Sequence, residues 1–251
     1  MSWVTVLQGG VLVLFLGLGG LFPRVPQGFV TRSTVLNVVT GGFLFALRLA
    51  VVMIVGGVES HGVIAMGWAS APAVQFLVAF LLLDFARYAI HYADHRVSWL
   101  WFFHRVHHSS EELDATSGLR MHAVDLLQLT AIPLVLFSLL LDTRGFEAWV
   151  IPSAMAVGVV FDAFQHANIR MDMTRPLNRL LNKCVNNPHF HCWHHTRDGV
   201  LRDGNYANVL LVWDHLFGTV VTQPEVPEAY GLPESQRLSQ SVVDLQLLRS
   251  A

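Results

Sequence analysis

The sequence predicts an all-α fold, an integral membrane helical bundle that carries a cytosol-facing helical cap. Hydrophobic residues make up 53% of the 251 residues and charged residues only 14%, whereas about a quarter of an ordinary soluble domain is charged. Several apolar runs approach the roughly 20 residues that a helix needs to cross a ~30 Å hydrocarbon core. A chain with so few charges cannot cover its surface in water, so we expect it in a bilayer.

Three apolar runs in the first third of the chain are the expected spans. They cover residues 3–22, 36–58 and 64–83, and only the second contains a charge, Arg48. The first run has neither a basic start nor a clear small-residue cleavage site, which disfavours a removable signal peptide. We therefore expect transmembrane helices over residues 1–83.

Two further apolar stretches, 122–142 and 148–161, are separated by a polar turn. They predict a membrane hairpin over about 123–163, and the sequence leaves open whether this hairpin crosses the bilayer completely. After Phe161 the chain is more polar, and residues 170–208, which hold many Asn, Asp and Arg, are expected to form short helices and loops. Residues 221–251 are rich in Pro, Glu and Ser and are expected to form a C-terminal tail.

The arginines predict the orientation of the bundle. The loop between the first two runs carries Arg24 and Arg32, whereas the loop at 59–61 contains neither Lys nor Arg. Positively charged loops tend to stay on the cytoplasmic side. The third run then ends near Asp84 on the cytoplasmic face, although Arg48 and Arg144 do not follow this simple bias.

Charge and cysteine content exclude other classes of protein. The net charge is −2, and the single lysine is Lys183. No basic stripe is present for nucleic acid, so we exclude nucleic acid as a partner. Cys184 and Cys192 fit no zinc or redox spacing, and we expect them to be reduced thiols.

The 13 histidines are concentrated in spaced groups. Residues three and four apart on a helix point the same way, so each group is expected to present its imidazoles on one face. His166 stands alone between the last two groups. The groups are His91 and His95; His104, His107 and His108; and His191, His194 and His195.

This many imidazoles indicates a metal site with two ions. Unmetallated histidines packed together near a membrane would be costly, and neutral imidazole is a common ligand of iron, zinc and copper. One tetrahedral zinc takes four ligands, so eight or nine imidazoles suit two metals. Neither the Glu-x-x-His pairs of soluble di-iron bundles nor a His-Glu-x-x-His protease motif occurs.

The motifs occur in the order HYADH (91–95), HRVHH (104–108), FQHANI (164–169), HCWHH (191–195) and NYANVLLVWDHLFGT (205–219). Over about residues 80–220 the chain resembles the fatty acid hydroxylase and sterol desaturase superfamily of membrane non-haem di-iron enzymes. The resemblance implies that residues 84–220 form a catalytic domain of that type. It also implies a helical cap that holds the metal site on the cytosolic side.

The resemblance implies two Fe ions as cofactor and O₂ as co-substrate. The substrate would be a lipid such as a sterol, a fatty acyl chain or an alkyl lipid, oxidised at a C–H bond by hydroxylation or desaturation. No flavin, nicotinamide or haem motif is evident, so an external electron donor is implied, a ferredoxin or a b-type cytochrome with its reductase. The implied ligands are His91, His95, His104, His107, His108, His166, His191, His194 and His195.

Departures from the family pattern concern three places. Tyr92 stands where relatives often carry Arg. His122 lies in Arg-Met-His-Ala-Val-Asp, where the family often has Arg-x-His-Pro-x-Glu, and could be a ligand or a supporting residue. His215 replaces a common Arg or Lys and is interpreted as structural, and His189 and His61 are also left out of the ligand set.

Two carboxylates have the helical spacing to support the ligands. Asp84 lies seven residues before His91, and Asp162 lies four before His166. A carboxylate that accepts the second imidazole N–H fixes the ring and raises its basicity. We expect Asn205, Tyr206 and Asp214 to brace the third histidine box, and the aromatic residues 99–103 to form an interfacial belt.

Other classes of function remain as alternatives. A metal transporter would place its ligands inside the spans, near the bilayer midplane, whereas these motifs follow the spans. A zinc-dependent membrane hydrolase would hold zinc and need no O₂. A b-type haem protein would need only two histidines.

Overall fold

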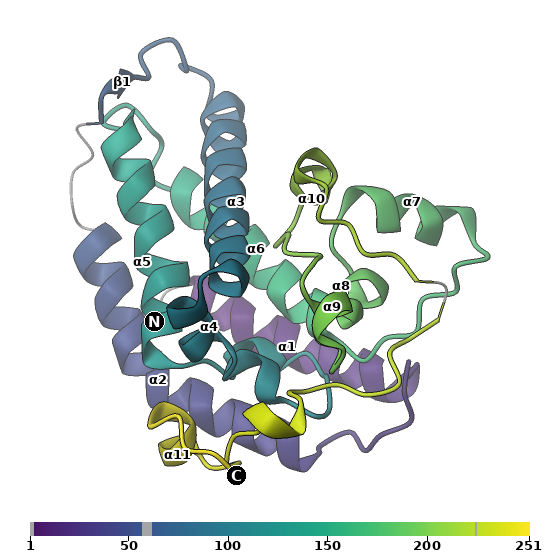
Figure 1. The fold of residues 1–251 in the computed structure, drawn as a ribbon. Helices are drawn as coiled ribbons and strands as arrows, with labels where there is room; N and C mark the ends of the chain where they lie inside the picture. The colour runs from purple at the N-terminus through teal and green to yellow at the C-terminus, as the bar shows by residue number, and fades with distance from the viewer. Residues whose placement is uncertain (1–2, 57–61, 224) are drawn as a thin grey trace.

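The computed structural model describes residues 3–56, 62–223 and 225–251 and confirms the helical membrane bundle (Figure 1). Four described helices are long and apolar enough to cross a membrane, and α6 (Val150–His166) is a shorter apolar helix. His61, expected on the far side of the membrane, lies outside the described residues. The four long helices are α1 (Trp3–Leu21), α2 (Arg32–Gly56), α3 (Pro72–Arg96) and α5 (Ala123–Leu140).

The third helix begins and ends later than the apolar run that predicted it. Pro72 occupies the first turn, where its missing N–H costs nothing. The preceding segment contains a two-residue strand, β1 (Ile64–Ala65), parallel to β2 (Leu141–Asp142). The helix then continues through Asp84 to Arg96, so the boundary expected at 83/84 lies inside one helix.

The bundle is held together by apolar contacts among α3, α5 and α6. Ala79 and Leu83 of α3 share a buried cluster with Leu134 of α5 and Ala154 of α6. α1 lies against α6, and α2 lies against α5. The stretches predicted as a hairpin correspond to α5 and α6, which are joined by β2 and a turn and both pack against α3, and α5 is long enough to span.

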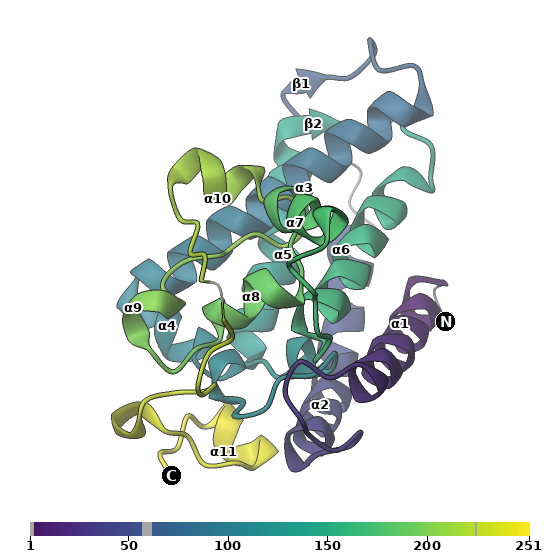
Figure 2. The same cartoon turned by 90° about the vertical axis from the view of Figure 1, so that its right-hand side faces the viewer.

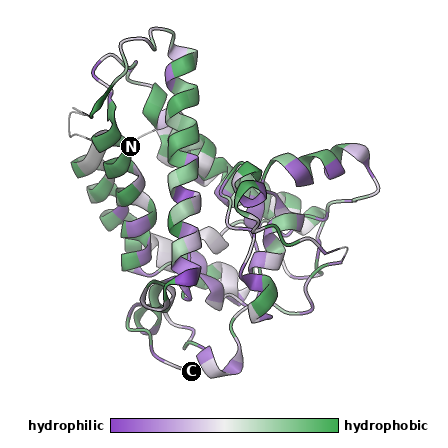
Figure 3. Ribbon diagram, turned by 45° about the horizontal axis from the view of Figure 1, so that its top comes forward, coloured by the Kyte–Doolittle hydropathy of each residue, from purple (hydrophilic) through white to green (hydrophobic). Residues whose placement is uncertain are grey.

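The remaining described helices are short and pack at one end and along one side of the bundle (Figures 1 and 2). Hydrophobic residues dominate the upper part of α3, and hydrophilic residues gather where the long helices meet the cap (Figure 3). The short helices are α4 (Ser98–His104), η1 (His107–Ser109), η2 (Ser117–Leu119), α7 (Pro176–Cys184), α8 (Pro188–His194), α9 (Gly199–Arg202), α10 (Val212–Phe217), η3 (Glu234–Gln236) and α11 (Val242–Gln246).

The C-terminal tail is folded onto the junction of α2, α4 and α5. Leu238 and Leu245 are buried with Val106 in one apolar cluster. The fully buried guanidinium of Arg120 donates to the side-chain oxygen of Gln240 at 2.8 Å. The tail therefore closes the cap around a buried charge.

Candidate metal centre

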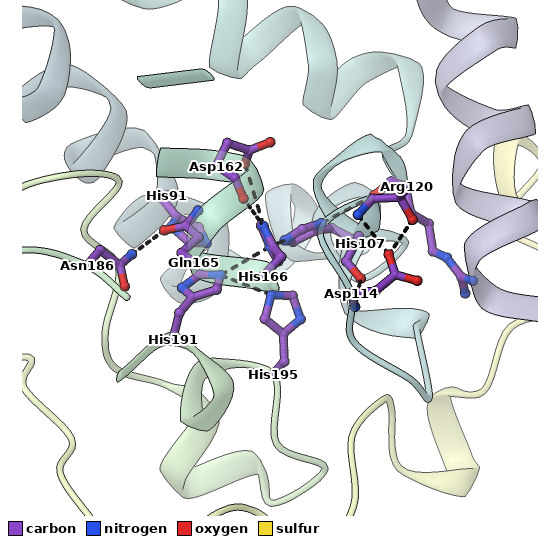
Figure 4. Close-up of polar contacts among 12 residues, drawn as sticks. His91, His107, Asp114, Arg120, Asp162, Gln165, His166, Asn186, His191 and His195 are labelled. Carbon is purple, nitrogen blue, oxygen red and sulfur yellow. Dashed lines mark hydrogen bonds and ion pairs between the residues drawn. The ribbon is translucent and has the colours of Figure 1, made fainter. Parts of the chain in front are cut away.

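The nine histidines that the sequence singled out come together in two adjoining groups. Within each group the candidate ligand nitrogens all lie within 4.8 Å of one another. Figure 4 shows His166 at the middle of the second group, with His107 and His191 on either side. The first group contains His91, His95, His104, His108 and His194, and the second contains His107, His166, His191 and His195.

Four segments supply these side chains. The last two turns of α3 carry the first box, and α4 and η1 carry the second. The final residue of α6 is His166, and α8 with the residue after it carries the third box. The short helix α8 starts at a fixed point because the side chain of Asn187 accepts hydrogen bonds from the backbone N–H groups of His189 and Phe190.

The sequence predicts one face for each triplet, and the structure divides the rings of each triplet between the two groups. α4 ends at His104, and a separate 3₁₀ turn begins at His107. His104 and His108 therefore join the first group, while His107 points into the second. The third box is divided in the same way, with His194 in the first group and His191 and His195 in the second. Each triplet thus contributes to both groups.

The spacing of the inward ring nitrogens fits a shared metal ion. The Nε2 atoms of His95 and His108 are 3.1 Å apart, and those of His166 and His191 are 3.2 Å apart. Nitrogens bound to one ion at ~2.1 Å and at right angles would lie ~3.0 Å apart. The buried Nε2 of His194 has no hydrogen-bond partner in the described structure, which is costly unless a cation occupies the centre. The donor set therefore fits two metal ions.

The outward nitrogens of six rings are bonded to protein oxygens. Each such bond requires a proton on Nδ1, which leaves the lone pair of Nε2 facing inward for a metal. The Nδ1 acceptors are the carbonyls of Tyr206 for His91 (2.8 Å), Arg120 for His107 (3.3 Å), Asp162 for His166 (2.7 Å) and Gly204 for His194 (2.8 Å), and the carboxylates of Asp203 for His95 (3.2 Å) and Asp125 for His104 (3.1 Å).

A buried pair of carboxylates stands behind His104, and the sequence reasoning missed it. The Asp125 carboxylate lies 3.1 Å from Nδ1 of His104, and that of Asp94 lies 3.9 Å away. Burial alone would lower the pKa of His104, but these carboxylates together raise it. Asp94 lies in the first histidine box beside His95, and Asp125 lies three residues after His122.

Burial sets the protonation of the other cap histidines. It lowers the pKa of each ring well below 6.5, and the neighbouring imidazoles add to the effect. The rings are therefore neutral at pH 7, which is the form that binds a metal. The histidines concerned are His107, His108, His191, His194 and His195.

His122 lies outside both groups. Its Nδ1 accepts a hydrogen bond from the backbone N–H of Val124, and its Nε2 is 3.0 Å from the carbonyl of Gln246. The ring thus caps α5 and fastens α11, which favours the supporting role over the ligand role. His215 also lies outside both groups, and its Nε2 is 3.2 Å from the carbonyl of Lys183.

The two predicted supporting carboxylates act differently from the expectation. Asp84 accepts hydrogen bonds from the backbone N–H groups of Val209 and Leu210 and from the indole of Trp213. It therefore holds the segment after α9 and is bonded to no imidazole in the described structure. For His166 the acceptor is the carbonyl of Asp162, whose carboxylate lies 3.8 Å from the ring.

The segment 205–219 braces the centre through its backbone. The side chain of Asp214 accepts hydrogen bonds from the N–H groups of Tyr206 and Ala207. The side chain of Asn205 donates to the carbonyl of Phe190 in α8. These bonds fix the Tyr206 carbonyl that receives Nδ1 of His91.

The predicted aromatic belt is only partly at the surface. Trp99 is 62% exposed, as an interfacial residue would be. Trp101 instead packs against His95 and His108, with ring centroids 5.0 and 5.3 Å apart. It therefore forms part of the wall of the centre.

A cavity of about 290 Å³ lies among the membrane helices. Its walls come from α1, α2, α3, α5 and α6, and they are mainly apolar, as at Phe80, Leu83 and Leu134. Such a volume is near the lower end for small-molecule sites. It offers space for an apolar chain, and its wall residue Arg87 lies one helical turn before His91 on α3.

Comparison with known proteins places the site in a family. A sequence model described as "Fatty acid hydroxylase" matches residues 76–219, which include all nine histidines. Human alkylglycerol monooxygenase is 33% identical over 156 residues, covering 61% of this chain and 32% of that protein. Ornithine lipid hydroxylase OlsE of Rhizobium tropici is 30% identical over 154 residues, covering 61% of this chain and 43% of that protein.

A third relative matches more of the chain. Alkylglycerol monooxygenase of Caenorhabditis elegans is 26% identical over 240 residues, covering 92% of this chain and 43% of that protein. The chain thus matches between a third and a half of the length of these relatives. No solved structure matches the chain.

Proposed function

The chain belongs to the fatty acid hydroxylase family, and on that premise we propose that it is a membrane oxygenase with a two-iron centre. It would use O₂ and external electrons to hydroxylate a C–H bond of a lipid. The observation that carries the proposal is the division of nine clustered imidazoles into groups of five and four, in a membrane bundle that also holds an apolar cavity.

The two histidine groups would each hold one iron. When bound, the iron pair supplies the oxidising power for an unactivated C–H bond. One oxygen atom enters the C–H bond and the other leaves as water, which takes up two external electrons and two protons. We expect the electrons to come from a ferredoxin or a b-type cytochrome with its reductase.

The residues of this chain would orient the ligands and exclude water. The Nδ1 hydrogen bonds would hold six of the imidazoles with Nε2 directed inward, and the Asp125 carboxylate would do so for His104. The apolar walls around Leu83 and Leu134 keep the substrate side dry. We place the centre on the cytoplasmic side because Arg24 and Arg32 flank the cap end of α1 and α2.

A lipid substrate is supported by the membrane helices and by the names of the relatives. The named relatives are an alkylglycerol monooxygenase and an ornithine lipid hydroxylase, which favours hydroxylation over desaturation. A sterol, a fatty acyl chain or an alkyl lipid is the class of substrate that we propose.

Metal analysis of the purified membrane protein tests the proposal. We expect about two irons per chain, with the spectrum of a coupled pair that responds to reductant and O₂. His107→Ala and His194→Ala remove one imidazole from each group, and each should abolish full iron loading and lipid turnover. His189→Ala, outside both groups, is the matched control.

Two results would contradict the proposal. Zinc alone, retained after expression in iron-rich medium and indifferent to O₂, would favour a zinc-dependent hydrolase. Full turnover in either His→Ala variant would remove the two-iron assignment. A transporter is disfavoured because the histidines gather where the bundle meets the cap.

A further inference from the structure

Two arginines line the apolar cavity inside the membrane bundle. Arg48 comes from α2 and Arg87 from α3, and both are half-buried. Within the described part of the chain neither guanidinium makes an ion pair or a hydrogen bond. Charged groups in membrane-spanning segments are costly and mark sites that bind something.

Neighbouring carboxylates do not neutralise this pair. Asp84 interacts with Arg87 electrostatically without a hydrogen bond. The carboxylate oxygens of Asp84 already accept three hydrogen bonds from residues 209–213. The charge of Asp162 reaches Arg48 in the same way, again without an ion pair. The two carboxylates thus act on the arginines only at a distance, and the guanidinium N–H groups keep no acceptor among the described residues.

The arginines lie at the end of the cavity nearest to the metal centre. Arg87 is one helical turn before His91, about 6 Å along the axis of α3. The apolar wall residue Phe80 is two further turns away, about 10 Å. On α2, Leu47 packs in the cluster that includes Leu126 and Leu129 near the start of α5, which puts the adjacent Arg48 at the same end.

The helix opposite makes room for the guanidinium of Arg87. A side chain at Gly158 of α6 would place its Cβ 2.8 Å from Nη1 of Arg87 and 3.2 Å from the amide nitrogen of Asn208. The absence of a side chain there lets the guanidinium and the amide lie together against α6. Asn208 and Arg87 therefore form one polar end of the cavity.

We propose that Arg48 and Arg87 bind the oxyanion of a single-chain lipid, with the alkyl chain along the apolar part of the cavity. The inference rests on the proposed lipid oxygenase function and narrows its substrate. A guanidinium pairs with carboxylate or phosphate through two parallel hydrogen bonds. A cavity of about 290 Å³ offers space for one chain rather than two.

The test compares probes with the same chain and different heads. Radiolabelled dodecanoate, dodecyl phosphate and dodecanol are equilibrated with the metal-loaded protein in neutral-detergent micelles, without reductant. We expect at least one oxyanion probe to bind about tenfold or more tightly than dodecanol. Preference for dodecanoate indicates a fatty-acid-like ligand, and preference for dodecyl phosphate indicates a phospholipid-like one.

Variants assign the preference to the two arginines. Arg48→Gln and Arg87→Gln should each weaken oxyanion binding by about tenfold and change dodecanol binding by less than about twofold. Arg87→Lys keeps the charge and should retain part of the affinity. The control is Arg179→Gln, on the exposed side of α7, which should leave all three affinities unchanged.

Equal binding of the acid, the phosphate and the alcohol would overturn the inference, and so would an equal effect of the Arg179 control. Gel filtration of each variant shows whether the fold is retained, and Arg87→Lys provides a second comparison. Because binding is measured without turnover, the outcome is independent of the oxygenase proposal. Arginine-dependent binding without hydroxylation would contradict only the oxygenase, whereas hydroxylation of neutral lipids alone would contradict only the oxyanion site.

Discussion

At the scale of single residues, six of the nine clustered histidines are held by a hydrogen bond from the outer nitrogen Nδ1 to a protein oxygen. Histidine spacing in the sequence predicts eight members of the two groups, and the resemblance to the family implies the ninth, His166. It could not predict their division, because the break between α4 and η1 is not visible in the spacing. Nor could it identify Asp125, since the carboxylate is brought to His104 only by the packing of α5 against α4.

Removal of the Asp125 charge should weaken the first group. We expect Asp125→Asn to lower iron affinity by about 10–100-fold, because the carboxylate orients His104 and raises its basicity. Competition with a chelator measures the loss, which should affect one iron of the pair first. Asp125→Glu keeps the carboxylate and should retain most of the affinity, while wild-type retention in Asp125→Asn would rule out this role.

The buried imidazoles predict how the metal-free protein responds to acid. The unfolded chain takes up protons near pH 6.5, where the buried rings of the folded state stay neutral because their pKa values are lower. Stability should therefore fall as the pH drops below about 6.5. His104, with its raised pKa, opposes this trend, but it is one ring against several.

Thermal unfolding of the metal-free protein between about pH 8 and pH 5.5 checks this sign. The midpoint should be lowest at the acid end. A midpoint that stays constant or rises toward acid pH would mean that the rings are not buried in the neutral form.

At the scale of elements, α3 joins the bilayer to the centre. Hydropathy predicts the existence of this helix but places it too early, because an apolar run does not mark where a helix begins. Pro72 gives the true start, and the helix passes Asp84 without a break. The short cap helices depend on contacts between distant segments, such as Asn205 with Phe190, which no local pattern contains.

Loss of the Asp84 charge should loosen the segment after α9. In Asp84→Asn the amide cannot accept all three hydrogen bonds from Val209, Leu210 and Trp213. We expect a destabilisation of about 1–3 kcal/mol, measured as a lower unfolding midpoint in detergent. Asp172→Asn, at an exposed site of the cap, should change stability by less than about 0.5 kcal/mol, and equal effects of the two would contradict the bracing role.

At the scale of the whole molecule, an apolar helical bundle meets a more polar folded cap. Composition predicts the membrane class because a chain with 14% charged residues cannot be covered in water. It did not predict that the tail would close the cap, since the burial of Arg120 by Gln240 joins residues far apart in the sequence.

The two cysteines provide a test of orientation. Cys184 is exposed in the cap, and Cys192 is buried. A membrane-impermeant thiol reagent should label Cys184 in inverted vesicles and not in right-side-out ones, because we place the cap on the cytoplasmic side. Cys184→Ser should abolish the signal, and labelling only from the outside would reverse the proposed orientation.

The continuity of α3 also has a consequence for where a lipid is oxidised. One unbroken rod carries a wall of the cavity, the arginine nearest the centre and the first two imidazoles. Because the helix is continuous, its rise per residue fixes the distance between the arginine that would bind the head group and the histidines at which the lipid would react. We expect lipids of different chain length to be oxidised at the same carbon counted from the head, with any surplus length extending into the bilayer.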